Sequence, residues 1–97
     1  MITVVIRGDS MWPTLKDGDE IEFKAIGDSV LQIDDIVVAQ HPLKPTITVV
    51  KRIIATKQGR YILQGDNPDP LASEDSHNFG PVSKDLILGY LRSELSE

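Results

Sequence analysis

The 97-residue sequence contains no cysteine, which excludes disulfide bonds and thiolate chemistry. No apolar stretch approaches the roughly 20 residues that a bilayer-spanning helix needs, and the N-terminus lacks the basic-then-apolar pattern of a secretion signal. Aromatic residues make up only 5% of the chain, the net charge is −5, and the longest basic run is Lys51-Arg52. A nucleic-acid partner needs a basic surface with stacking side chains. We therefore expect neither a nucleic-acid partner nor an integral membrane segment.

Apolar residues are 40% of the sequence, which is typical of a folded globular protein. A chain of this length forms one domain with a small core. We expect residues 1–97 to be that domain, with a frayed acidic tail from about residue 92. The two histidines are far apart in sequence and no acidic run has the spacing of a calcium loop, so no metal or cofactor is expected.

Short β-branched and apolar runs, separated by turn residues, indicate strands. Six such runs occur, at residues 2–6, 20–23, 36–39, 46–55, 61–64 and 86–91. The run 36–39 is apolar on both faces, as in a central strand, and no segment has the pattern of a long amphipathic helix. The prediction is an all-β fold, a small single-domain barrel or folded sheet of short, mostly antiparallel strands.

Ser10 lies in the stretch GDSMWPTL at residues 8–15, directly after the first expected strand. Gly8 can adopt backbone angles that other residues avoid, and Pro13 restricts both itself and Trp12. This combination could hold a serine hydroxyl on a stiff bend at a strand end. By itself, the stretch is more often an ordinary polar turn. Whether Trp12 belongs to the core or lines a substrate groove is left open.

Lys51 lies in the longest expected strand, and alternation places it on one face with Ile47, Val49 and Ile53. Burial in apolar surroundings disfavours the charged form of a lysine and would let it act as a base. The alternative is a strand lysine whose alkyl chain packs while its ammonium group reaches water. Arg52 points to the other face and is expected to be structural.

Four blocks in order resemble the type I signal peptidase family of Ser/Lys proteases. They are SMWPTL at 10–15, DIVV at 35–38, KR at 51–52, and GDN at 65–67 followed by SEDS at 73–76. The resemblance runs from about residue 8 to residue 89 and implies a fold like that of signal peptidases and SOS-repressor proteases. Within the family, the short form with His41-Pro42 between the middle blocks is most similar to the maturation proteases of nickel superoxide dismutase.

The resemblance implies that Ser10 is the nucleophile and Lys51 its general base. It further implies that Ser73 orients Lys51 and that Asp75 supports the site. The family pairs this aspartate with an arginine two residues on, where this sequence has His77. Histidine cannot reproduce the two-pronged contact of an arginine, so the pair is expected to be weaker.

Other residues near the serine are expected to complete the site. The backbone N–H of Ser10 is the expected donor to the oxyanion, because the family's additional serine donor is replaced here by Gly8. Gly65, Asp66 and Asn67 are expected to shape the loop that follows the fifth strand, as supporting residues. The candidates for the substrate groove are Gly8, Asp9, Met11 and Val49.

The function implied is a serine endopeptidase that removes an N-terminal leader from a protein precursor bound as an extended peptide. The resemblance suggests the nickel superoxide dismutase precursor as a dedicated substrate. Without the N-terminal anchor usual in the family, a soluble, cytoplasmic protein is expected, although membrane association stays open, as does the oligomeric state. The alternatives are a non-catalytic β-barrel that binds extended peptides and a self-cleaving SOS-repressor-type domain.

Overall fold

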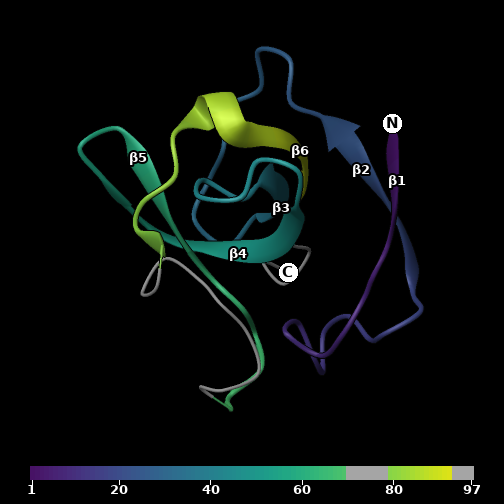
Figure 1. Cartoon of the computed structure of the whole chain (residues 1–97). Coiled ribbons are helices and arrows are strands. Elements are labelled where there is room, and N and C mark those ends of the chain that lie inside the picture. Colours follow the sequence, from purple (N-terminus) through teal and green to yellow (C-terminus); the bar gives the residue numbers. More distant parts are fainter. Residues whose placement is uncertain (70–78, 93–97) are drawn as a thin grey trace.

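The computed structural model describes residues 1–69 and 79–92, which form one six-stranded β-sheet (Figure 1). The strands are β1 (Ile2–Val5), β2 (Glu20–Ala25), β3 (Ile36–Gln40), β4 (Thr48–Lys57), β5 (Arg60–Gln64) and β6 (Ile87–Leu91). A short 3-10 helix, η1 (Lys84–Leu86), leads into β6. The all-β prediction is confirmed, and each of the six expected strands is present with slightly different ends.

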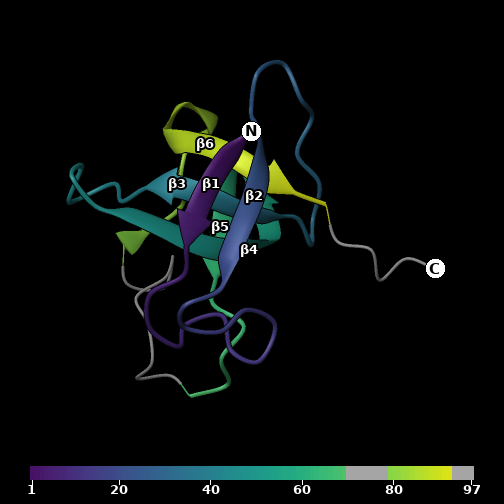
Figure 2. The ribbon, with the colours of Figure 1, turned by 90° about the vertical axis from the view of Figure 1, so that its right-hand side faces the viewer.

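The strand order is β1-β2-β6-β3-β4-β5, and every neighbouring pair is antiparallel. The sheet bends where β2 meets β6, because only Lys24↔Tyr90 and Ala25↔Gly89 pair there. In Figure 2, β1 and β2 consequently cross in front of β3, β4 and β6. The folded sheet places the end of β1 close to the start of β4, which is the region of the candidate site.

The central strand β3 divides the core into two clusters. Ile36 and Val38 pack on the side of β1 and β2, with Met11 and Phe23 among their neighbours. The alternate residues Val37 and Ala39 pack on the opposite side, in a cluster that also holds residues of β4, β5 and β6. A strand that alternates between two clusters must be apolar on both faces. The interpretation of residues 36–39 as a central strand is therefore confirmed.

β4 begins at Thr48 and not at the predicted residue 46, because the residues before it form a turn between β3 and β4. The Nδ1 atom of His41 accepts hydrogen bonds from the backbone N–H groups of Leu43 and Lys44, at 3.0 and 3.1 Å. The N–H of His41 also bonds to the carbonyl of Ile47 at 2.8 Å. These bonds keep residues 41–47 in a closed turn, and His41, which is only 3% exposed, is a structural residue of that turn.

The end of β6 is fastened to the loop before β3. Arg92, where the acidic tail was expected to begin, donates two hydrogen bonds to Asp35 at 3.0 and 3.1 Å. Asp35 is buried and also accepts the N–H of Gln32 at 2.9 Å. Residues 93–97 lie outside the described part of the chain.

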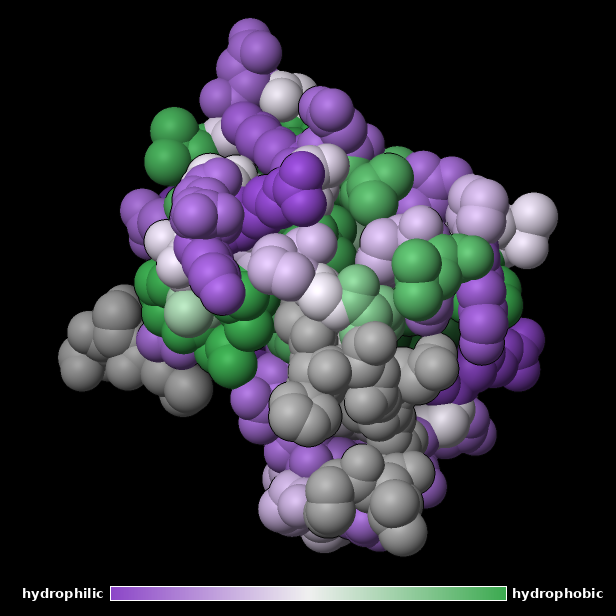
Figure 3. All heavy atoms as spheres, turned by 60° about the vertical axis from the view of Figure 1, so that its left-hand side comes forward, coloured by the Kyte–Doolittle hydropathy of each residue, from purple (hydrophilic) through white to green (hydrophobic). Residues whose placement is uncertain are grey.

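The described surface does not present one continuous apolar face in the view of Figure 3, where hydrophobic side chains form separate small groups among hydrophilic ones. No helix within residues 1–69 and 79–92 has the length and apolar character needed to span a bilayer.

Candidate active site

Ser10 and Lys51 line the same cleft, although they are distant in the sequence. The cleft has a volume of about 200 Å³ and lies between the end of β1 and the start of β4. One wall is formed by residues 4–7 and the other by residues 48–51, with Ser10 and Met11 between them. The structure therefore brings the predicted nucleophile and the predicted base to one site.

Lys51 is 3% exposed, although it carries an ammonium group when protonated. It lies opposite Val37 in the β3–β4 pair, and Ile53 on the same face of β4 is fully buried. The predicted face of β4 is thus confirmed as the inward one around Lys51. Lys51 is not a surface lysine whose head group extends into bulk water, because almost none of the residue is accessible. The sequence analysis also placed Ile47 on this face, but Ile47 lies before the start of β4 and is exposed.

The two walls of the cleft carry backbone groups that no strand within residues 1–69 and 79–92 uses. Ile6 directs its N–H and C=O toward the β2 side, bonding to Asp19 and Gly18 at 2.8 Å. Because backbone groups alternate along an antiparallel strand, those of Val5 and Arg7 point to the other side, which is the cleft side. β1 is an edge strand, so no strand of the described sheet covers them.

The same alternation applies to the first half of β4. Ile53 exchanges hydrogen bonds of 2.8 Å with Asp34 and Asp35 on the β3 side. Thr48 and Val50 therefore direct their backbone groups away from β3. The partner strand β5 pairs with β4 only from Arg52 onward. Among the described strands, the cleft thus lies between two edges without a partner strand, an arrangement that can accept an extended peptide as an added strand.

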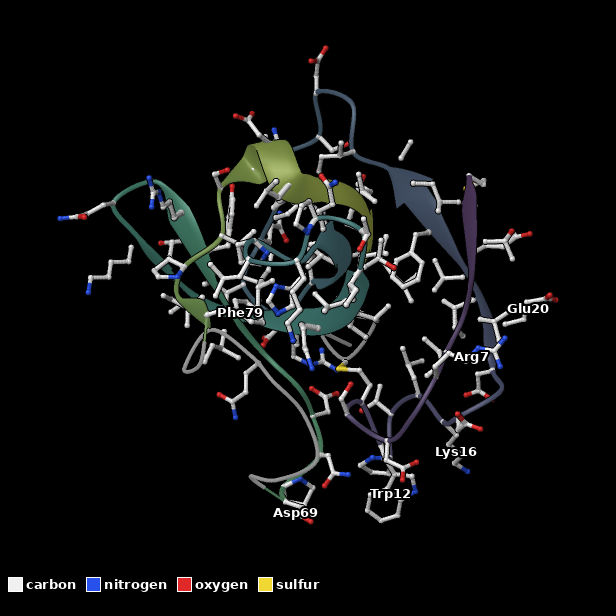
Figure 4. All side chains as sticks on the ribbon, viewed as in Figure 1. Arg7, Trp12, Lys16, Glu20, Asp69 and Phe79 are labelled. Atoms are coloured by element: carbon white, nitrogen blue, oxygen red, sulfur yellow. The ribbon has the colours of Figure 1, made fainter. Side chains whose placement is uncertain are left out.

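The serine turn is held by contacts on both of its sides. Gly8 has a φ of 81°, which favours glycine, and its N–H bonds to Asp17 Oδ1 at 2.7 Å. Met11 and Leu15 are 1% and 7% exposed and anchor the turn in the core. Trp12, by contrast, is 46% exposed and does not line the cleft. Figure 4 shows it at the same end of the molecule as Asp69, below the sheet.

The residues directly after β5 hold the serine turn from the opposite side. Asn67 donates from Nδ2 to the carbonyl of Asp9 at 2.8 Å and from its backbone N–H to the carbonyl of Ser10 at 3.0 Å. Its Oδ1 accepts the N–H of Asp69 at 2.9 Å. The sequence analysis predicted a supporting role for Asn67 but did not predict its hydrogen bonds to the serine turn.

Asp66 joins the serine turn to β4. Its carboxylate accepts two hydrogen bonds from Arg52, at 2.9 and 2.7 Å, and one from the hydroxyl of Thr14 at 2.6 Å. Burial by itself would raise the pKa of Asp66, but the hydrogen bonds from Arg52 and Thr14 and the charge of Arg52 together lower it. Arg52 also bonds to the carbonyl of Asp34 at 2.9 Å. The structure confirms Arg52 as a structural residue, and Thr14 is a partner that the sequence analysis missed.

The other predicted site residues have mixed outcomes. Met11 and Val49 line the cleft, and Met11 is at the same time a core residue. Gly8 and Asp9 are not among the residues that line this cleft; Gly8 bonds to Asp17 and Asp9 to Asn67, and their part in a substrate groove stays a prediction. Ser73, Asp75 and His77 lie outside the described residues. Within the described ranges, no three His, Asp or Glu side chains are grouped as a metal site would require.

Comparison with known proteins places the chain in one family. The profile of the family described as "Signal peptidase, peptidase S26" matches residues 1–57, a range that includes both Ser10 and Lys51. The chain is also similar to "Mitochondrial inner membrane protease subunit 1" of Xenopus tropicalis, with 31% identity over 108 aligned positions. That alignment covers 89% of this chain and 64% of the relative, so the chain spans somewhat less than two thirds of the relative's length.

Proposed function

Because the chain belongs to the signal peptidase family S26, we propose that it is a serine endopeptidase in which Ser10 is the nucleophile and Lys51 the general base. The observation that carries this proposal is the shared cleft, in which a serine on a tightly held turn and a buried lysine line one cavity. A serine hydroxyl attacks a peptide carbonyl only when a base takes its proton. A neutral lysine can do so, and a buried position disfavours its charged form.

The proposed reaction has two stages. In the first, the neutral amine of Lys51 takes the hydroxyl proton of Ser10 while the oxygen attacks the scissile carbonyl carbon. The resulting oxyanion accepts a hydrogen bond from the N–H of Ser10. The lysine then gives the proton to the departing amine, which leaves an ester on Ser10. In the second stage Lys51 takes a proton from a water molecule whose oxygen attacks the ester carbon. The bond from that carbon to Ser10 Oγ then breaks, Lys51 returns the proton to Oγ, and the acid product leaves.

The proposed substrate is a protein precursor whose leader enters the cleft in an extended conformation. The unpaired backbone groups of Val5 and Arg7 on one side, and of Thr48 and Val50 on the other, support this binding mode. Backbone pairing holds a chain without reading most of its side chains. Val49 and Met11 line the cleft and would favour a small residue just before the cut by excluding bulk.

The resemblance of the sequence to the maturation proteases of nickel superoxide dismutase suggests the precursor of that enzyme as the specific substrate. In the same proposal, Ser73 orients Lys51 and Asp75 supports the site. The relative from Xenopus tropicalis is by its name a subunit of a mitochondrial inner membrane protease, and its similarity supports a proteolytic function in general. Both the substrate and these two roles are part of the proposal.

Incubation of the purified protein with the candidate precursor, followed by N-terminal sequencing of the product, tests the substrate. Labelling by a serine-directed acylating reagent, with mass mapping of the modified residue, tests the nucleophile. The proposal predicts one new N-terminus and a label on Ser10 alone. A protein that binds the precursor without cutting it, and that takes up no label, would be a peptide-binding domain.

A further inference from the structure

Asn67 contacts both peptide groups that flank the α-carbon of Ser10. Its side-chain Nδ2 donates to the Asp9 carbonyl at 2.8 Å, in the peptide group before Ser10. Its backbone N–H donates to the Ser10 carbonyl at 3.0 Å, in the peptide group after Ser10. The amide orientation is fixed, because Oδ1 accepts the N–H of Asp69, which can only donate. One residue thus holds the planes on both sides of the proposed nucleophile.

The contact with Asp9 determines where the Ser10 N–H points. The Asp9–Ser10 bond is trans and planar, so its carbonyl oxygen and its N–H point in opposite directions. A hydrogen bond that holds the oxygen therefore also aims the N–H. The same oxygen accepts the N–H of Trp12 at 3.1 Å. Within residues 1–69 and 79–92, the Ser10 N–H makes no backbone hydrogen bond.

We infer that Asn67 is a positioning residue for the oxyanion site, acting through the Asp9–Ser10 peptide group and not by touching the substrate. A carbonyl that accepts a hydrogen bond also polarises its peptide group, which makes the N–H of that group a stronger donor. This inference rests on the proposed function and adds to it the group that orients the backbone donor of Ser10.

The test compares Asn67→Ala and Asn67→Asp with the wild-type protein. Asn67→Asp keeps the volume and the Oδ1 acceptor for Asp69, replaces the Nδ2 donor with a carboxylate oxygen and adds a negative charge, so it serves as a second variant if the alanine variant does not fold. Kinetics are measured on a cleavable peptide. Inhibition is measured with a peptide aldehyde, whose adduct with Ser10 carries the oxyanion, and with the matching peptide alcohol, which cannot form that adduct.

Loss of a direct oxyanion donor lowers kcat by roughly 10²–10³-fold, so loss of an indirect one should lower it by about ten- to a hundredfold. KM should stay close to the wild-type value, the affinity for the aldehyde should fall by the same factor as kcat, and the affinity for the alcohol should not change. A purely structural role would lower both affinities together.

Asp66→Asn is the matched control, because Asp66 ties the same loop through Thr14 and Arg52 without contacting either peptide group of Ser10. The control should leave the ratio of aldehyde to alcohol affinity unchanged. An equal fall of that ratio in Asp66→Asn, or an unchanged ratio in both Asn67 variants, would overturn the inference. A wild-type protein with neither cleavage nor preference for the aldehyde would overturn the proposed function itself, and this inference with it.

Discussion

The hydroxyl of Thr14 donates a hydrogen bond of 2.6 Å to Asp66, a residue 52 positions further along the chain. The same carboxylate receives two hydrogen bonds from Arg52, the residue after Lys51. The serine turn, the strand of Lys51 and the segment after β5 therefore meet at one side chain. This contact fixes the position of the serine turn relative to β4, and the first predictions concern the pair of residues that it brings into one cleft.

Ser10→Ala and Lys51→Met should each lower kcat about a thousandfold or more, and the double variant should be little worse than either single one, because the two residues act as a unit. Burial disfavours the charged form of an amine, and methionine has a similar volume without a polar group to desolvate. Lys51→Met should therefore keep the fold. Peptide cleavage and thermal unfolding check both results, and substantial activity in either single variant would contradict the Ser/Lys mechanism.

The rate of cleavage should rise with pH between about pH 6 and pH 9, because only neutral lysine accepts a proton and its neutral fraction grows with pH. The measurement is kcat/KM against pH, together with thermal unfolding at each pH to show that the fold persists. A profile that is flat over this range while chemistry limits the rate would exclude a lysine base.

Val5→Pro should raise KM by about three- to tenfold, which corresponds to one backbone hydrogen bond. The N–H of Val5 points to the cleft side of β1, and proline removes it without removing a bond to β2. Thr3→Pro is the matched control, since Thr3 has the same orientation on β1 but lies outside the cleft lining. An equal effect of both changes on KM would mean that peptides do not pair with this edge.

Asp66→Asn should destabilise the protein at pH 7 by about 1 kcal/mol, a value kept small because the Arg52–Asp66 pair is partly exposed to solvent. The pKa of Asp66 is lowered in the fold. Its charge therefore stabilises the fold above the unfolded-state pKa, near 3.8, and this contribution is lost as the pH falls through the lowered folded-state pKa. Urea unfolding measures the free energy of unfolding of variant and wild type at pH 7 and pH 3. The difference between the two proteins should be smaller at pH 3. A difference that is equal at both pH values would contradict the ion pair.

Gly89→Ala should destabilise the fold by about 1–3 kcal/mol through overpacking. A Cβ at this position would lie 2.8 Å from the carbonyl oxygen of Lys24 and 3.2 Å from Cβ of Phe23, where β2 crosses β6. Leu88→Ala, at the exposed neighbouring position, is the control and should cost less. The measurement is the thermal unfolding temperature of both variants. A Gly89→Ala protein as stable as the wild type would mean that β2 can move away from β6 to make room for the Cβ.

The sequence by itself determined the strands and their faces, because these follow from local alternation. The apolar run at 36–39 identified the central strand, and the alternation through residues 49–53 grouped Lys51 with Val49 and Ile53 on one face, where the structure shows Lys51 and Ile53 to be buried. The order of the four blocks also pointed to the family. The start of β4 could not be predicted in this way, because it depends on hydrogen bonds that the buried ring of His41 makes within its turn.

Only the tertiary structure decided that Ser10 and Lys51 share a cleft, that Asn67 holds the peptide groups of Ser10, and that Thr14 contacts Asp66. It also decided that Trp12 is exposed. These contacts depend on the crossing of the β1–β2 pair over β3 and β4, which is set by the short pairing between β2 and β6. Side-chain periodicity says which face of a strand is buried, but the angle between two parts of a sheet comes from packing between residues far apart in the chain.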